Sequence, residues 1–203
     1  MKTIIRWFVL ILLISLVPET ARSWESFRLP RVIAGGSAGY FYLALNDFKS
    51  IYSSKWDRLY SGNVNIRVYR GFYLSLQYAQ YLNKKAKDDI AASQSVSWDE
   101  RFFNVGIRRY VDTLGKWNLY SGLGFVFISI TETPGATIFE NNTDGKTKGN
   151  GFYFELGSRR ALLPNLGLFL EFEISSAGEG GTPGFVGHNI GGYAFQCGLE
   201  LNF

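Results

Sequence analysis

Few side chains in this sequence could carry out nucleophilic, acid–base or metal chemistry. Among its 203 residues there is one histidine, His188, and one cysteine, Cys197. A single cysteine excludes an intramolecular disulfide and a multi-cysteine zinc site. A single histidine gives no support to a histidine metal centre. We therefore predict no metal and no cofactor, and interpret Cys197 as a small apolar residue.

Two groups near the C-terminus could still support catalysis. Ser175 would become a nucleophile if a base took its hydroxyl proton, and His188 is the histidine that could do so. Glu171 and Glu173 would share one face of a strand, and a pair of carboxylates is the acid–base machinery of a glycosidase. We interpret His188 as a solvated loop residue. We interpret the glutamates as ion-pair partners, because the small barrel predicted below admits no sugar chain.

The elements that position these residues are segments of about ten residues in which apolar side chains alternate with small or polar ones. Such alternation predicts strands with two different faces. From Tyr193 to Phe203 the odd positions are apolar and the even positions are small or polar. Eight strands are predicted, at about residues 32–46, 62–70, 72–82, 101–111, 117–131, 151–162, 168–176 and 193–203.

The connections between these strands alternate in length. Short turns, in which glycine would supply a positive φ, are expected at 70–72, 112–116 and 163–167. Long polar connections cover about 47–61, 83–100, 132–150 and 177–190. All short turns therefore lie at one end of the sheet, an asymmetry typical of outer-membrane barrels with short periplasmic turns and long extracellular loops.

Residues 1–23 have the features of a secretory signal. Lys2 and Arg6 give a basic start, residues 7–17 are apolar except for Ser15, and 21–23 offer small residues to a signal peptidase. As a helix the apolar run would span roughly 16 Å, about half of a bilayer core. We predict a signal peptide at 1–23 and a barrel at 24–203, with cleavage after Ser23.

Alternation alone does not say which face points inward, because a secreted lipocalin-like barrel has the reverse arrangement. Here the apolar set is bulky, whereas the other set is rich in small residues that suit a narrow interior. Gly122 and Gly124 are expected to leave room for large neighbours such as Tyr153. We therefore predict that the apolar set, including Phe41, Leu43 and Leu45 of the first strand, faces lipid.

Charges on the opposite face would have to pair inside the barrel. The predicted strand faces carry no lysine, in contrast to a soluble surface. The predicted interior ion-pair network comprises Arg67, Arg108, Glu155, Arg159, Glu171, Glu173 and Glu200.

Aromatic residues gather at the strand ends, as in the girdles at membrane interfaces. One predicted girdle contains Tyr110, Trp117 and Phe203, and the other contains Phe102, Phe103, Phe152 and Tyr193.

The overall charge does not indicate a nucleic-acid partner. The formal net charge is +4, and no basic run is interleaved with aromatic residues. Aromatic residues make up 17% of the chain and charged residues 19%, a composition that suits a strand-rich fold and excludes a disordered chain.

From Arg31 to Phe203 the chain resembles the small eight-stranded bacterial outer-membrane β-barrel proteins. The resemblance rests on the leader, on 39–43 (GYFYL), on 120–125 (YSGLGF) and on 198–203 (GLELNF). It implies an all-β, eight-stranded antiparallel up-and-down transmembrane barrel, exported by a cleaved signal peptide to the outer membrane of a Gram-negative cell envelope.

The resemblance also implies partners. Leu199, Leu201 and Phe203 resemble the C-terminal assembly signal of such barrels, which the barrel-assembly machinery would read during biogenesis. The surrounding outer-membrane lipid and lipopolysaccharide would be the other partners of a monomer.

Residues 173–178 carry a weaker resemblance, to the lipid A deacylase barrels. That family has His-x-Ser followed by Asn-Ala-Gly, whereas this chain has Glu-Ile-Ser-Ser-Ala-Gly. Glu173 stands where the histidine belongs, so the family's mechanism would need His188 as the base for Ser175.

We predict a structural or surface-interaction protein with a side-chain-filled interior, acting through its extracellular loops, rather than an enzyme. A lipid A-modifying enzyme built on Ser175, His188 and Glu173 is the alternative, and a small pore is a further one.

Overall fold

The computed structural model describes residues 30–45, 48–52, 54–83, 97–112, 117–132, 145–179 and 189–203. The predicted signal peptide and His188 lie outside these residues. The elements are β1 (Val32–Leu43), α2 (Phe48–Ile51), β2 (Trp56–Tyr69), β3 (Phe72–Asn83), β4 (Trp98–Asp112), β5 (Trp117–Glu132), β6 (Lys146–Leu163), β7 (Leu166–Glu179) and β8 (Gly192–Asn202). Within the described ranges, no helix is long and apolar enough to cross a membrane.

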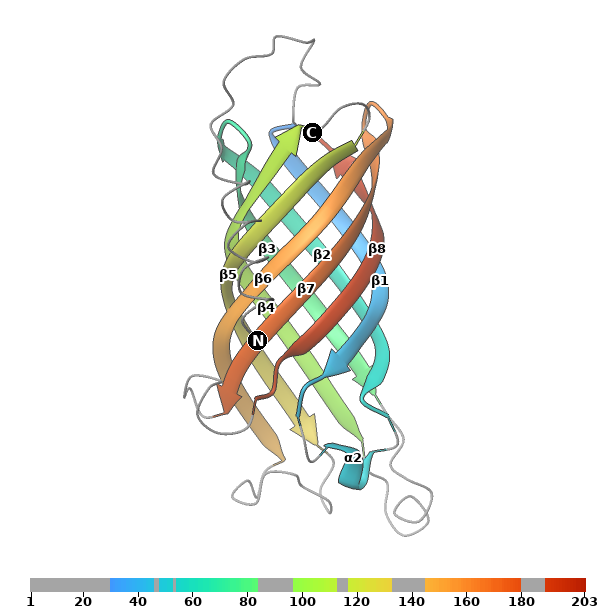
Figure 1. Cartoon of the computed structure of the whole chain (residues 1–203), viewed down its shortest axis with the longest axis vertical. Coiled ribbons are helices and arrows are strands. Elements are labelled where there is room, and N and C mark those ends of the chain that lie inside the picture. Colours follow the sequence, from blue (N-terminus) through green and yellow to red (C-terminus); the bar gives the residue numbers. More distant parts are fainter. Residues whose placement is uncertain are drawn as a thin grey trace, which may run out of the picture.

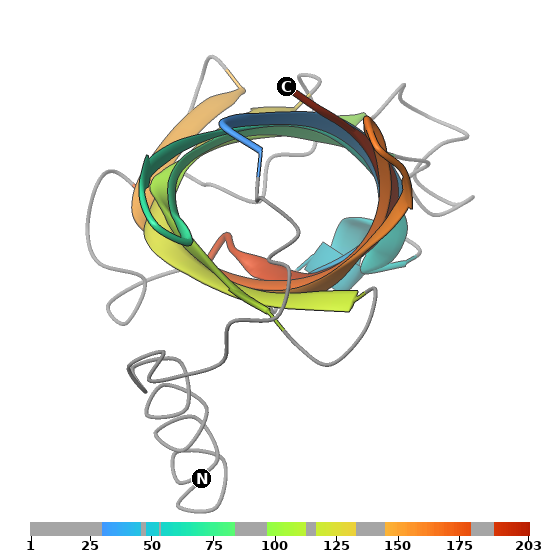
Figure 2. The same cartoon turned by 90° about the horizontal axis from the view of Figure 1, so that it is seen from above.

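The eight strands form one closed antiparallel barrel in which each strand pairs with its neighbours in sequence. Figure 2 looks into this barrel and shows the strands as a continuous ring. Closure is made by β1 and β8, which pair from Ile33↔Asn202 to Leu43↔Gly192. Phe203 extends the seam, since its N–H donates to the Val32 carbonyl oxygen at 2.9 Å. The prediction of an eight-stranded up-and-down barrel is confirmed.

The turn between β2 and β3 corrects one detail of the sequence analysis. It consists of Arg70 and Gly71, and the residue with a positive φ is Arg70, at 24°. The expectation that glycine supplies the positive φ is therefore wrong here. Gly71 is needed for a different reason, because a Cβ at this position would lie 2.7 Å from the carbonyl oxygen of Tyr110.

The strands continue further than predicted toward the end of the barrel at which α2 lies (Figure 1). β2 begins at Trp56 instead of about residue 62, and β6 begins at Lys146 instead of about 151. This extension places the exposed side chains of Lys146 and Lys148 on a strand. The expectation that strand faces carry no lysine is therefore wrong.

The assignment of faces is wrong for the first strand. Phe41, Leu43 and Leu45 are at most 2% exposed, whereas Tyr40 is 59% exposed. Phe41 packs against two other interior rings, Tyr81 at 5.2 Å and Phe102 at 5.0 Å between centroids. The interior of this half of the barrel is mainly apolar and aromatic, so the more apolar of the two alternating sets of β1 points inward.

On the other strands the apolar set points outward, as expected. The exposed large side chains include Val64, Ile66, Leu74, Ile107, Leu123, Phe125, Phe195, Leu199, Leu201 and Phe203. Two residues assigned to the aromatic girdles do not belong there, because Phe102 and Tyr110 are buried. Both residues occupy inward positions of β4, which alternate with its outward positions.

Near the long connections, the interior holds a cluster of buried apolar and aromatic side chains. It includes Phe41, Leu43, Phe48, Tyr52, Tyr81, Trp98, Val126, Ile128, Ile130 and Ile190. α2 contributes Phe48, whose ring stacks on Tyr52 at 4.4 Å and meets Trp98 edge-on at 5.1 Å. Burial raises the pKa of the Tyr52 hydroxyl, and the Glu132 carboxylate 3.5 Å away raises it further.

The β1–β8 seam should be sensitive to the size of residue 39. A Cβ on Gly39 would collide with the main-chain carbonyl of Phe195, which cannot move without parting the two strands. We predict that Gly39→Ala lowers the free energy of unfolding by roughly 1–3 kcal/mol, measured by urea titration in lipid vesicles. The matched control is Gly36→Ala, whose Cβ would lie 3.6 Å from its nearest neighbour. Equal effects of both substitutions would contradict the prediction.

Candidate functional site

The chemically richest group of side chains lies inside the barrel and is centred on Arg108 of β4. The Arg108 guanidinium donates to both carboxylate oxygens of Glu155, at 2.6 and 2.7 Å, and to Glu171 Oε2 at 2.7 Å. It also lies over the ring of Tyr120, with 4.4 Å from Cζ to the ring centroid. Arg108, Glu155 and Glu171 are each at most 3% exposed. This is a buried bidentate pair with a second carboxylate, a geometry that suits the planar guanidinium.

Hydrogen bonds extend this group around the whole barrel. Glu171 accepts from Tyr120, Gln77 and Gln196 at 2.9, 3.3 and 3.4 Å. Asn104 donates to Gln77 and to Glu173, both at 3.0 Å. The members are Ser37 (β1), Ser61 (β2), Gln77 (β3), Asn104 and Arg108 (β4), Tyr120 (β5), Glu155 (β6), Glu171 and Glu173 (β7) and Gln196 (β8). We call this set the interior network, and it includes a side chain from every strand.

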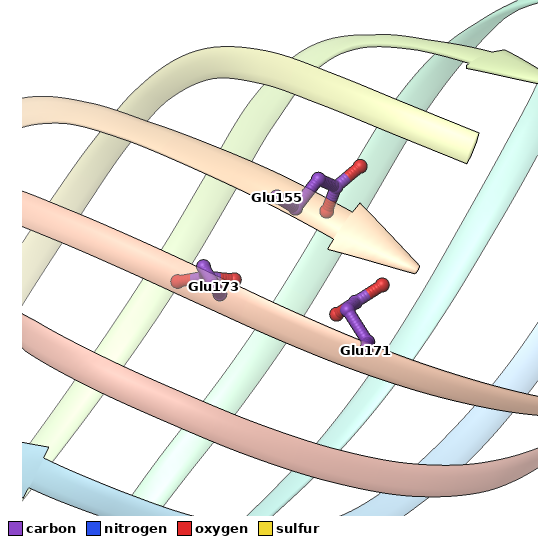
Figure 3. A group of neighbouring side chains, drawn as sticks. All are labelled: Glu155, Glu171 and Glu173. Atoms are coloured by element: carbon purple, nitrogen blue, oxygen red, sulfur yellow. The ribbon is translucent and has the colours of Figure 1, made fainter. Parts of the chain in front are cut away.

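The three glutamates of the network lie side by side on β6 and β7 (Figure 3). Each offers an oxygen within 4.8 Å of the other two, a spacing that could suit a bound cation. The Arg108 guanidinium already donates to two of them, and Asn104 donates to the third. These carboxylates are therefore engaged by side chains of the barrel itself.

Two glycines make the space that this arrangement needs. A Cβ on Gly122 would collide with the Glu155 carboxylate, so β5 must present a bare backbone there. A Cβ on Gly124 would lie 2.8 Å from the ring of Tyr153. The expectation that these glycines leave room for large neighbours is confirmed. The close approach of Glu155 and Tyr153 explains why glycine occurs inside a strand here.

A second polar group lies toward the short-turn end. Arg159 pairs with Glu200 and also donates to Asn202. Arg67 of β2 is half-buried, and its register partner on β3 is Tyr73. The structure thus brings Arg108 together with Glu155 and Glu171, and Arg159 together with Glu200, while Glu173 is held through Asn104.

The residues of the alternative catalytic interpretation are placed differently from those of a lipid-facing enzyme. Ser175 is buried and points inward, and its Oγ accepts a hydrogen bond from the Gly192 N–H at 3.2 Å. Glu173 is also buried and accepts from Asn104. His188 lies outside the described residues. The serine therefore does not lie on the outward face, where the nucleophile of a lipid-facing enzyme would lie.

The uncharged members of the interior network are not evident from the sequence. Alternation places Gln77, Asn104 and Gln196 on the polar face of their strands and predicts no role for them. Their positions in the register are the signal that could have found them, since Gln77 pairs with Asn104 and Gln196 pairs with Glu171. These pairings follow from the register of neighbouring strands, and the alternation of side chains along one strand does not determine that register.

Comparison with known proteins relates the chain through its fold. No known protein family matches the sequence, and no curated protein is significantly similar to it. Among solved structures, Neisserial surface protein A aligns with a TM-score of 0.60 at 14% identity, covering 85% of this chain and 96% of that one. The N-terminal β-barrel domain of Pseudomonas aeruginosa OprF aligns with a TM-score of 0.54 at 14% identity, covering 86% and 98%.

The attachment invasion locus protein Ail of Yersinia pestis aligns with a TM-score of 0.54 at 12% identity, covering 85% of this chain and 97% of Ail. Together these similarities show that the chain has the fold of the small eight-stranded outer-membrane β-barrels.

Removing the central cation should destabilise the barrel strongly. Arg108→Met leaves Glu155 and Glu171 buried without a counter-charge, so we predict a loss of roughly 3–5 kcal/mol in the free energy of unfolding. Urea titration in lipid vesicles, followed by tryptophan fluorescence, measures it. Adding Glu155→Gln and Glu171→Gln to the same chain should recover part of the loss, because the uncompensated charges are then removed.

The matched control for this prediction is Arg58→Met, which removes an exposed arginine from β2 and should change stability by about 0.5 kcal/mol or less. If Arg108→Met were no more damaging than this control, the interior network would not hold the barrel together.

Proposed function

We propose that this protein is an integral outer-membrane β-barrel with a side-chain-filled interior, and that its structural or surface-interaction role is exercised by its long connections. The observation that carries the proposal is the outward face of the barrel. Large apolar side chains are exposed on β2 to β8, for example Val64 (39%), Leu123 (57%) and Leu199 (52%), and Tyr40 is exposed on β1. An exposed apolar surface of this extent marks an interaction with lipid or protein, and its belt shape favours lipid.

The two edges of this belt support a membrane setting. At the short-turn end, arginines lie over outward aromatic rings, at 5.4 Å for Arg70 and Tyr69 and 5.5 Å for Arg160 and Trp117. At the other end Tyr42 contacts Trp56, with 5.1 Å between ring centroids. Aromatic and basic side chains combine an apolar body with a polar tip, which suits the level of lipid headgroups.

The interior contents favour a closed barrel over a pore. The interior network joins side chains of all eight strands, and the apolar cluster lies between it and the long connections. Eight strands give an interior just wide enough for side chains to fill. We infer that no continuous water path crosses the barrel.

A surface role is consistent with the strand ends that the long connections join, all of which belong to the same end of the barrel, the end at which α2 lies (Figure 1). Binding functions concentrate on loops that a rigid scaffold positions. Two proteins with this fold are named a surface protein and an attachment invasion locus protein. By the same proposal Leu199, Leu201 and Phe203 direct assembly by the barrel-assembly machinery, and lipopolysaccharide surrounds the monomer.

The single native cysteine tests both the location and the orientation of the barrel. Cys197 is exposed on the outward face of β8, within the apolar belt. We predict that a water-soluble maleimide does not label it on intact cells or isolated membranes, because lipid covers it. The same reagent should label it once the protein is unfolded in denaturant.

Two control variants in a Cys197→Ser background complete this experiment. Ser54→Cys, beside the long connections, should be labelled on intact cells. Asn165→Cys, in the β6–β7 turn, should be labelled only after the outer membrane is permeabilised. Labelling of Cys197 in intact membranes would contradict the lipid location, and the reverse pattern at Ser54 and Asn165 would contradict the orientation.

A filled interior predicts that the protein forms no steady ion channel. In planar bilayers we expect no reproducible single-channel conductance, because side chains block the path. A general porin provides the positive control. Steady conductance that disappears on Glu171→Gln or Arg67→Gln would show that ions pass through the interior and would refute the closed-barrel proposal.

A further inference from the structure

An open groove of about 730 Å³ lies on the outer wall of the barrel, close to the long-connection end of β3 to β6. Its lining is apolar on one side, with Tyr78, Phe103 and Phe127, and polar on the other, with Arg101, Ser129 and Lys148. The register arranges these residues as two neighbouring rows, one following Tyr78↔Phe103↔Phe127 and the next following Arg101↔Ser129↔Lys148. The groove therefore crosses the edge of the apolar belt.

The polar row carries positive charge that can receive an anion. The Arg101 side chain is 54% exposed, and its Nε and Nη2 donate to Asp99 at 3.0 and 2.7 Å. The Nη1 N–H groups point elsewhere, because a guanidinium has five donors in a fixed fork. Lys148 is exposed and forms no ion pair with any residue that the structure describes. Among the residues that the structure describes, Arg101 and Lys148 are the basic side chains that line this groove.

The spacing of the basic residues fits one phosphate group. Arg101 on β4 and Lys148 on β6 are separated by one strand, which places their backbones about 10 Å apart. Both side chains are long enough to reach a point above Ser129, which lies between them in the register. The Ser129 hydroxyl would be a third donor. Such a cluster of charge-assisted donors is the chemistry that recognises phosphate.

The apolar row fits the remainder of an amphipathic ligand. Tyr78, Phe103 and Phe127 are between 46% and 49% exposed and face outward directly beside the basic row. The next row toward the middle of the barrel continues with Phe125 and Phe152, whose rings lie 5.1 Å apart. An acyl chain that descends from a phosphate at Ser129 would therefore lie along aromatic side chains.

We propose that this groove binds a phosphorylated, acylated lipid of the outer leaflet, with the phosphate between Arg101 and Lys148 and an acyl chain against Phe103 and Phe127. This inference rests on the proposed membrane location and orientation, and it adds a specific lipid site to them. The charge at the belt edge and the apolar wall below it are complementary to the phosphate and acyl parts of lipid A.

The test uses the protein isolated from membranes and inserted into phosphatidylcholine nanodiscs that contain bis-phosphorylated lipid A. Native mass spectrometry then counts the lipid A molecules that stay bound. The double variant Arg101→Gln/Lys148→Gln should retain about tenfold less lipid A than the unaltered chain, because two basic contacts to the phosphate are lost. Lipid A with its phosphates removed should be retained weakly by both proteins.

The matched control is Arg160→Gln, which removes an outward arginine at the opposite rim and should leave lipid A retention unchanged. Equal retention by the double variant and the unaltered chain, or an equal loss in the control, would overturn the proposed site. Displacement of all lipid A by inorganic phosphate would also overturn it, because the apolar wall would then contribute nothing. A chain that folds but does not enter nanodiscs would instead refute the proposed membrane location, on which the site depends.

Discussion

Closure of the sheet by β1 and β8 sets the conditions for every other feature of the barrel. Because these strands pair from Ile33↔Asn202 to Leu43↔Gly192, the barrel has no free edge, and each strand has a partner on both sides. A wall with paired backbone groups can lie in a medium that offers no hydrogen bonds. Closure also divides the side chains into an inner and an outer set, so each strand must satisfy two different environments. Gly39 shows how little space the seam allows, since even a methyl group there would meet the opposite backbone.

The inner set is divided along the barrel. Toward the long connections it is mainly apolar and aromatic, with Glu100 and Glu132 buried beside Trp98 and Tyr52, and in the middle it becomes the interior network around Arg108 and Glu171. Buried charges are tolerated only when they are paired and hydrogen-bonded. Here the pairing joins strands far apart in the sequence, such as β4 with β6 and β7. An arrangement of strands that separated these partners would leave buried charges unpaired. The ion pairs therefore favour the observed arrangement over others. Glycines at 122 and 124 provide the space for this packing.

The outer set has the opposite composition and a clear boundary. Apolar side chains cover the middle of the wall, and aromatic residues with nearby arginine or lysine lie at its two edges. At the edge near the long connections, the row of Phe103 and Phe127 is followed directly by the row of Arg101 and Lys148. Between these two neighbouring rows of outward residues, the surface of the barrel changes from one that suits acyl chains to one that suits phosphate. The proposed lipid site is a consequence of that change.

Local periodicity and turn composition are enough to predict the number of strands, the alternation of short and long connections and the outward set on seven strands. The same pattern predicts seven charged residues inside the barrel; four of them belong to the interior network, Arg159 and Glu200 pair in a second group, and Arg67 is half-buried. Periodicity cannot specify which side chains meet, because that depends on packing and strand register. In β1 both alternating sets are bulky, so only the apolar interior near the long connections made Phe41 point inward. Strand register decided which partners meet, such as Arg108 with Glu155 and Arg101 beside Ser129. Alternation gives each side chain a face, whereas its neighbours depend on how far each strand is shifted against the next.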